Sequence, residues 1–173
     1  MNTYKISEFI KYKFKALSSH GVHSPFVFNF IINIIENKTS PANFIKSISD
    51  LPELNEIEKK YQSILLNIIK YFEYNNIINA DFLQKNTGSK FDLLILSENK
   101  LQEWAEICEI AYIHIHKDSC IVVNNIYNSI FHTKEWQKLY LNPNVKLSID
   151  LFGIGLLFFK EEFKEKQHFN LKC

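Results

Sequence analysis

The sequence predicts an α/β layered fold in one domain, residues 1–173. Short apolar runs alternate with amphipathic segments in its second half, the pattern of strands joined by crossover helices. Two runs, Phe91–Leu96 and Cys120–Val123, are apolar throughout except for Asp92, as expected for parallel strands buried on both faces. With 46% hydrophobic residues the chain can bury one sizeable core. We expect a helical segment at 1–75 and a sheet at 76–173.

The helical segment begins with apolar residues at helical intervals over 3–17, which predict a first helix ending near Gly21. Ser24 before Pro25 predicts a second helix start. A serine hydroxyl can cap a free backbone donor, and proline at the first helical position loses no hydrogen bond. This helix, over 25–37, is apolar almost all round, so we expect it to be deeply packed.

A polar connector is predicted next, with breaks at Thr39–Pro41 and Asp50–Pro52. A long amphipathic helix over Glu53–Tyr74 follows, with its apolar positions on one face. Asn76–Ala80 is a short strand candidate, and it precedes the clearer strand at Phe91–Leu96.

The remaining elements continue the alternation. Helices are predicted over 101–114 and 133–141, on either side of the strand at 120–123. Strands are predicted over 145–151 and 154–159. The glycine between these two strands and the glycine within the second are typical of a tight hairpin turn.

Composition excludes several functional classes. The net charge of +1 predicts no electrostatic attraction to nucleic acid or to an anionic membrane. The first residues lack the apolar run of a signal peptide, and no stretch reaches the roughly 18 apolar residues of a membrane span. The cysteines, Cys108, Cys120 and Cys173, lack metal-binding spacing. We therefore expect a cytoplasmic protein without a metal site.

Histidines form two candidate pairs. His20 and His23 precede the second helix, and we interpret them as residues that orient a turn; the alternative is a role at a pocket mouth. His114 and His116 alternate and would share one face of a strand, where they could chelate a metal. Because few other ligand types are adjacent, we interpret them as capping or solvated side chains.

Residues 20–28 read His-Gly-Val-His-Ser-Pro-Phe-Val-Phe, and residues 148–159 read Ser-Ile-Asp-Leu-Phe-Gly-Ile-Gly-Leu-Leu-Phe-Phe. The first block is similar to an HGxHSPF signature, and the second is closed by Lys-Gln-His-Phe at 166–169. Together they resemble a family of small class I S-adenosylmethionine-dependent methyltransferases found in Bacteroidetes. With the helix around 61–74, the resemblance covers roughly two thirds of the chain.

The resemblance implies a Rossmann-like methyltransferase sheet in truncated form. The family's second and third strands have no counterpart here, which leaves about five strands, mostly parallel with an antiparallel strand in the C-terminal hairpin. The implied spatial order is first, fourth, fifth, seventh and sixth family strand. This deletion exposes one side of the first strand, an edge that the amino-terminal helices, a protein partner or a second copy of the chain should cover.

The resemblance also implies S-adenosylmethionine as cofactor, held at the carboxyl ends of the strands. The positions that correspond to this site are Asp81, Ser97, Asn99, Asn124 and Asn125. The segment after the first strand lacks the family's glycine-rich loop, and glycine is what lets backbone approach a nucleotide closely. Serine and amides replace the family's carboxylates. Each lost charge-assisted hydrogen bond removes about 1.5–3 kcal/mol of binding free energy.

Two functions follow as expectations. The first is a degenerate methyltransferase-like protein, a pseudoenzyme without efficient cofactor binding that acts as a binding or scaffolding protein. The alternative is a divergent but active S-adenosylmethionine-dependent methyltransferase on an unknown acceptor. The fold does not decide between them, because activity depends on the site.

Overall fold

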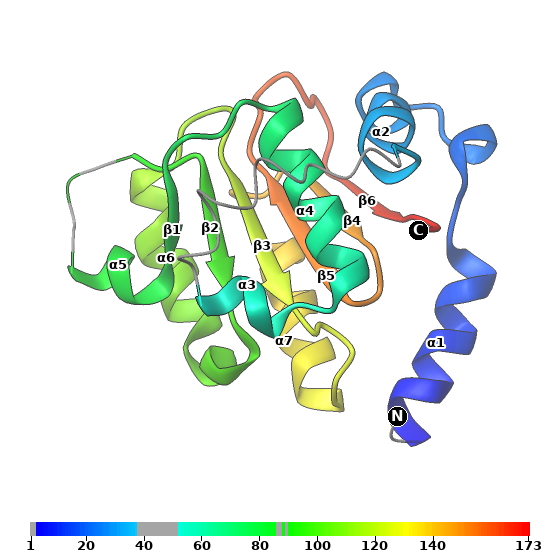
Figure 1. Ribbon diagram of the computed structural model, residues 1–173, viewed down its shortest axis with the longest axis horizontal. Helices are drawn as coiled ribbons and strands as arrows, with labels where there is room; N and C mark the ends of the chain where they lie inside the picture. Colours follow the sequence, from blue (N-terminus) through cyan, green and yellow to red (C-terminus); the bar gives the residue numbers. More distant parts are fainter. Residues whose placement is uncertain (1–2, 38–51, 86–87, 89) are drawn as a thin grey trace.

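The chain is an α/β structure in which one sheet lies between two layers of helices (Figure 1). The computed structural model describes residues 3–37, 52–85, 88 and 90–173. The breaks expected at 39–41 and 50–51 lie outside the described residues. No described helix is long and apolar enough to cross a membrane.

The sheet has the order β1-β2-β3-β5-β4-β6 among the described residues. β5 is antiparallel to both of its neighbours, and the other pairings are parallel. The predicted order of the first five strands is confirmed, but the sheet has six strands where about five were expected. The strands are β1 (Ile77–Asn79), β2 (Leu93–Leu96), β3 (Cys120–Asn124), β4 (Leu147–Asp150), β5 (Ile154–Phe158) and β6 (Gln167–Asn170).

Alternate residues of each central strand enter different hydrophobic cores. In β2, Leu93 and Ile95 pack into the core under α4 (Lys59–Tyr71), whereas Leu94 and Leu96 face the opposite core. This second core lies under three helices that follow strands in the chain. They are α5 (Ala80–Lys85), α6 (Trp104–His114) and α7 (Ile130–Leu141).

The amino-terminal helices are α1 (Thr3–Lys15), the 3₁₀ turn η1 (Ser19–Gly21), α2 (Pro25–Phe30) and the π-helical η2 (Ile31–Ile35). Pro25 occupies the first turn of α2 as predicted, but the Ser24 side chain makes no capping hydrogen bond. The deep packing predicted for this segment holds for one side, where Val27, Phe30, Ile31 and Ile34 are buried, but not for the other. Phe28 is 44% exposed and Ile32 39% exposed, because only the opposite side meets the core.

The long helix expected over Glu53–Tyr74 is interrupted. α3 (Pro52–Glu56) ends before α4 begins, and the buried Ile57 lies between them. The Gln62 side-chain amide donates hydrogen bonds to the carbonyls of Leu54 (2.9 Å) and Ile57 (2.7 Å), and these contacts tie the break to α4. The break allows α3 to lie across the carboxyl ends of β2 and β3 (Figure 1).

Other boundaries differ from the sequence prediction by a few residues. β1 ends at Asn79, and an unpredicted helix, α5, begins at the next residue. The helix expected from residue 101 is preceded by a 3₁₀ segment, η4 (Glu98–Glu103). α7 begins at Ile130 because the Ser129 hydroxyl accepts hydrogen bonds from the first backbone amides of that helix.

The amino-terminal segment covers the β6 edge of the sheet. Leu17 forms a parallel bridge with Leu171, and its amide donates to the Asn170 carbonyl at 2.8 Å. The Tyr12 hydroxyl donates to the carbonyls of Leu171 and, at 3.3 Å, Asp150. The expectation that these helices cover the β1 edge is therefore corrected: β1 is the terminal described strand on the other side.

Candidate functional site

The predicted site residues gather at one edge of the sheet. β1, β2 and β3 are mutually parallel, so their carboxyl ends meet there, and open α/β sheets bind ligands at this place. Asp81 follows β1 in the first turn of α5, and Ser97 follows β2 directly. Asn124 is the last residue of β3.

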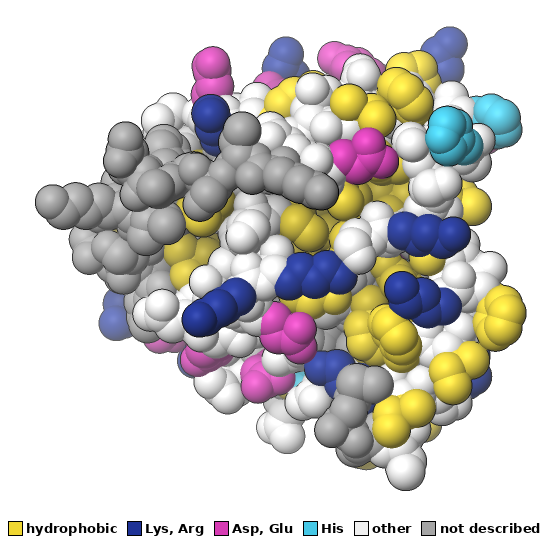
Figure 2. Space-filling model, turned by 45° about the vertical axis from the view of Figure 1, so that its right-hand side comes forward, with side chains coloured by type: hydrophobic (Ala, Val, Ile, Leu, Met, Phe, Trp, Pro, Cys, Tyr) yellow, Lys and Arg dark blue, Asp and Glu magenta, His cyan; other side chains and the backbone are white. Residues whose placement is uncertain are grey.

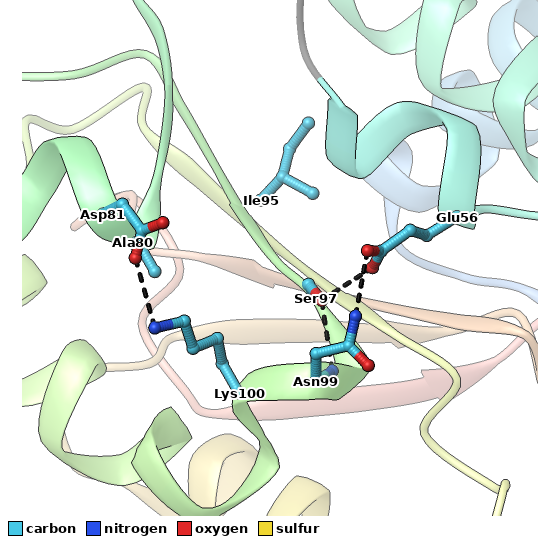
Figure 3. Close-up of a pocket in the computed structure, with 7 residues that line it drawn as sticks. All are labelled: Glu56, Ala80, Asp81, Ile95, Ser97, Asn99 and Lys100. Atoms are coloured by element: carbon cyan, nitrogen blue, oxygen red, sulfur yellow. Dashed lines mark hydrogen bonds and ion pairs between the residues drawn. The ribbon is translucent and has the colours of Figure 1, made fainter.

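A carboxylate that sequence reasoning missed, Glu56 of α3, is the centre of the site (Figure 3). The Ser97 hydroxyl donates a hydrogen bond to Glu56 Oε2 at 2.7 Å, and the Asn99 side-chain amide donates to Glu56 Oε1 at 2.9 Å. Ser97 is only 7% exposed. These contacts fasten α3 across the end of β2.

Ser97 is held rigidly from its other side. Its hydroxyl accepts a hydrogen bond from the Asn99 backbone amide at 3.1 Å, as the cap of the 3₁₀ segment η4. Its carbonyl accepts a hydrogen bond from the indole Nε1 of Trp104, a fully buried side chain, at 2.8 Å. The Ser97 hydroxyl therefore both donates and accepts a hydrogen bond within the protein.

An ion pair forms the opposite wall. Lys100 Nζ lies 3.2 Å from Asp81 Oδ1 and 3.5 Å from Glu103 Oε2. The hydrogen bond to Asp81 raises the pKa of Lys100, so the lysine stays charged and neutralises the carboxylate. Figure 3 shows Lys100 reaching Asp81 on one side while Glu56 approaches Ser97 and Asn99 from the other.

The hollow between these walls is small. Its volume is about 190 Å³, whereas pockets for drug-sized ligands are about 300–1,000 Å³. Its lining residues are Glu56, Ala80, Asp81, Ile95, Ser97, Asn99 and Lys100.

The two amides after β3 take different positions. Asn124 Nδ2 lies 3.4 Å from the Glu56 carbonyl, so it contacts α3 but does not line the hollow. Asn125 has a φ of 54°, and its amide donates to the Gly153 carbonyl at 2.7 Å. Its side chain donates to Glu98 Oε2 at 2.7 Å. The structure thus brings Asp81, Ser97 and Asn99 together around the hollow, whereas Asn125 does not line it.

A free backbone amide at the start of α5 is also satisfied by a side chain of the same protein. The Asn79 side-chain oxygen accepts a hydrogen bond from the Phe82 backbone amide at 2.8 Å, so it satisfies one of the free amides at the start of α5. β1 leads into α5 without an intervening loop. No backbone cradle for a nucleotide is formed by this connection.

A wider cavity lies elsewhere, between α1 and the start of α4. Its volume is about 530 Å³, and none of the predicted site residues lines it. Its walls include Phe9, Tyr61 and Phe152, with Lys5 Nζ 3.8 Å from Glu58 Oε1 at the rim.

The polar side chains at the Glu56 site are engaged in hydrogen bonds and in an ion pair with one another. No histidine or cysteine lines the hollow to act with Ser97. Over the described part of the chain, no cluster of three His, Cys, Asp or Glu residues could hold a metal ion. His116 Nε2 lies 2.9 Å from Asp92 Oδ1, and its Nδ1 accepts a hydrogen bond from the Asp118 backbone amide at 3.2 Å.

Sequence reasoning missed Glu56 and Lys100. Glu56 falls within the continuous helix that the sequence predicts over Glu53–Tyr74, whereas in the structure α3 ends at Glu56, whose carboxylate contacts Ser97. Lys100 carries a weak signal, since it lies four residues after the end of a buried strand.

Comparison with known proteins gives no family: no family model matches the sequence, and no curated protein or solved structure matches it.

Proposed function

We propose that this chain is a binding or scaffolding protein, built on a class I methyltransferase-like sheet that no longer holds S-adenosylmethionine efficiently. The observation that carries the proposal is the position of Glu56. Its carboxylate accepts hydrogen bonds from Ser97 and Asn99 at the strand end where an α/β fold would bind a ligand.

Size and charge support the same conclusion. The hollow of about 190 Å³ is smaller than the pockets that hold drug-sized ligands, and S-adenosylmethionine is larger than many of these. Asp81, the acidic residue nearest to β1, is already paired with Lys100 at 3.2 Å. A ribose diol would have to displace Lys100 before its hydroxyls could donate hydrogen bonds to the Asp81 carboxylate.

The connection after β1 supports it further. Close approach of backbone to a nucleotide is favoured by glycine, and none occurs between Ile77 and Lys85. The Asn79 cap already satisfies the Phe82 amide. Binding at this end would therefore cost the hydrogen bonds that the protein makes with itself.

Isothermal titration calorimetry with S-adenosylmethionine and S-adenosylhomocysteine tests the proposal. We expect no saturable heat from the wild-type protein at millimolar ligand. The variant Glu56→Ala, which removes the carboxylate, should show whether α3 alone closes the site, and Glu161→Ala is the matched surface control. Wild-type binding in the micromolar range, or methyl transfer to any acceptor, would overturn the proposal in favour of a divergent active methyltransferase.

The scaffolding part of the proposal is supported by the position of β1 as a terminal strand of the described sheet, since an edge strand can pair with another chain. A protein partner or a second copy would pair there. Light scattering that shows only monomer, together with no partner in a pull-down, would contradict this role.

A further inference from the structure

A row of exposed apolar side chains runs along α1 on the side that faces away from the core. Ile6 is 43% exposed, Ile10 53% and Phe14 88%. Leu17, which follows the helix, is 36% exposed. Leu17 lies beyond the last helical residue, Lys15, and forms a bridge with Leu171, so the helical repeat does not place its side chain. Ile6, Ile10 and Phe14 are four residues apart and therefore lie on one face of α1, since an α-helix has about 3.6 residues per turn. We call this row the α1 ridge.

The opposite face of α1 anchors the helix to the protein. Tyr12 is 5% exposed and Ala16 6%, and Phe9 packs edge-on against Phe152 with ring centroids 5.0 Å apart. Figure 1 places α1 at the side of the molecule away from β1. The helix is thus already formed and fixed, so a surface that contacts the α1 ridge does not have to order it.

Lysines accompany the ridge. At the helical repeat, Lys13 falls on one flank of the ridge and Lys11 on the other, and Lys15 lies in the last turn. The only acidic residue of α1 is Glu8, whose carboxylate lies 2.7 Å from Lys11 Nζ. In Figure 2, hydrophobic side chains and lysines lie side by side at the lower right, where α1 comes forward.

We propose that the α1 ridge adsorbs to the surface of a lipid bilayer that contains anionic lipids. The apolar side chains would enter the boundary between headgroups and acyl chains, and the lysines would meet the lipid phosphates. This arrangement of an apolar face with flanking lysines is typical of helices that lie in a membrane interface. The inference is independent of the proposed function, because no residue of the ridge belongs to the Glu56 site.

Charge decides between a bilayer and a second copy of the chain. Two copies that pair through their ridges would bring lysines of the same sign together, and α1 offers no unpaired carboxylate to oppose them. An anionic bilayer offers negatively charged phosphates to the lysines and acyl chains to the apolar side chains. Its surface can also deform around a convex ridge. The chain's net charge of +1 does not exclude this, because only charges within about a Debye length of the membrane contribute.

Sedimentation with sucrose-loaded vesicles tests the proposal on the full chain. Vesicles of phosphatidylcholine alone are compared with vesicles of equal parts phosphatidylcholine and phosphatidylglycerol, at low and at high salt. We expect the protein to sediment with the anionic vesicles at low salt and to be released by high salt. Replacing Lys13→Gln together with Lys15→Gln should weaken the partition constant by about fivefold per lysine.

The variant Phe14→Ser tests the apolar part, and Phe82→Ser is its control. Phe82 is also exposed, at 47%, but it lies on α5 at the other end of the sheet. We expect Phe14→Ser to lose at least tenfold in partition and Phe82→Ser to behave as wild type, with unchanged far-ultraviolet circular dichroism for both. No sedimentation with anionic vesicles, or equal binding by Phe14→Ser, would overturn the proposal. A concentration-dependent dimer that Phe14→Ser abolishes, without vesicle binding, would assign the ridge to a second copy instead.

Discussion

The Ser97 hydroxyl donates a hydrogen bond to the Glu56 carboxylate across 2.7 Å, and this contact joins two segments that lie 41 positions apart in the chain. Ser97 is buried at the end of β2, whereas Glu56 is exposed on α3. A strand end that would face a ligand in a related fold therefore faces a side chain of the same protein.

Replacement Glu56→Ala should cost little stability. Because the carboxylate is exposed, water can replace it as acceptor for Ser97 and Asn99, so we expect a loss below about 1 kcal/mol in the free energy of unfolding. Urea denaturation followed by circular dichroism measures it, with Glu161→Ala as control. A loss above about 2 kcal/mol would mean that α3 is a main structural support and not a removable cover.

Replacement Tyr12→Phe should be more costly. The Tyr12 hydroxyl is buried and donates to the carbonyls of Leu171 and Asp150, so its removal leaves a buried acceptor short of a partner. We expect a loss of about 1–3 kcal/mol and faster hydrogen exchange in β6. Tyr71→Phe is the control, because Tyr71 is 45% exposed. Equal stability of the two variants would show that α1 is not held through this hydroxyl.

Asp150 should make the stability depend on pH. Burial raises the pKa of Asp150 from 3.8 to about 6, and the Tyr127 hydroxyl, 2.7 Å from Oδ2, opposes this shift only in part. The folded state keeps the proton after the unfolded chain has lost it. The contribution is therefore fully present below pH 3.8 and is lost as the pH rises through about 6.

The variant Asp150→Asn isolates this contribution, since it keeps the shape of the side chain but does not ionise. From acid to neutral pH, the wild-type free energy of unfolding should fall by roughly 3 kcal/mol relative to the variant. The comparison with a variant is needed because His168 acts in the opposite sense: burial lowers its pKa to about 4. Parallel stability curves for the two proteins would show that Asp150 does not change its protonation on folding.

Gly155 should not tolerate a side chain. A Cβ at this position would lie 2.5 Å from the indole ring of Trp136, and Trp136 is only 1% exposed and cannot move aside. We expect Gly155→Ala to destabilise the protein by about 1–3 kcal/mol through overpacking. Gly88→Ala is the control, because no heavy atom lies within 4 Å of the added Cβ. Thermal denaturation of the two variants decides the matter.

Much of the sheet could be predicted because its signals are local. The apolar residues of β2 and β3 are consecutive, whereas a strand with one solvated face alternates apolar and polar residues. The two glycines near β5 indicate a hairpin. The family resemblance supplied the strand order. β6 was not predicted as a strand, because Gln167–Asn170 is short and mostly polar and becomes a strand only through pairing with β4.

The candidate site could be predicted only in outline. The positions of Asp81, Ser97 and Asn124 follow from the rule that parallel strands end at one edge. Their partners do not follow from it. That Lys100 pairs with Asp81, and that Asn125 turns toward Glu98, depends on side-chain directions that periodicity does not specify.

The sequence by itself determined an α/β chain with a parallel centre and an antiparallel hairpin strand, because burial on both faces of a strand requires a continuous apolar run. Only the tertiary structure decided where α3 lies, since the partners of Glu56, Ser97 and Asn99, are 41 and 43 positions away in the chain. The same holds for the edge that the amino-terminal segment covers. Leu17 meets Leu171 through backbone hydrogen bonds, and backbone groups are the same at every position of the sequence.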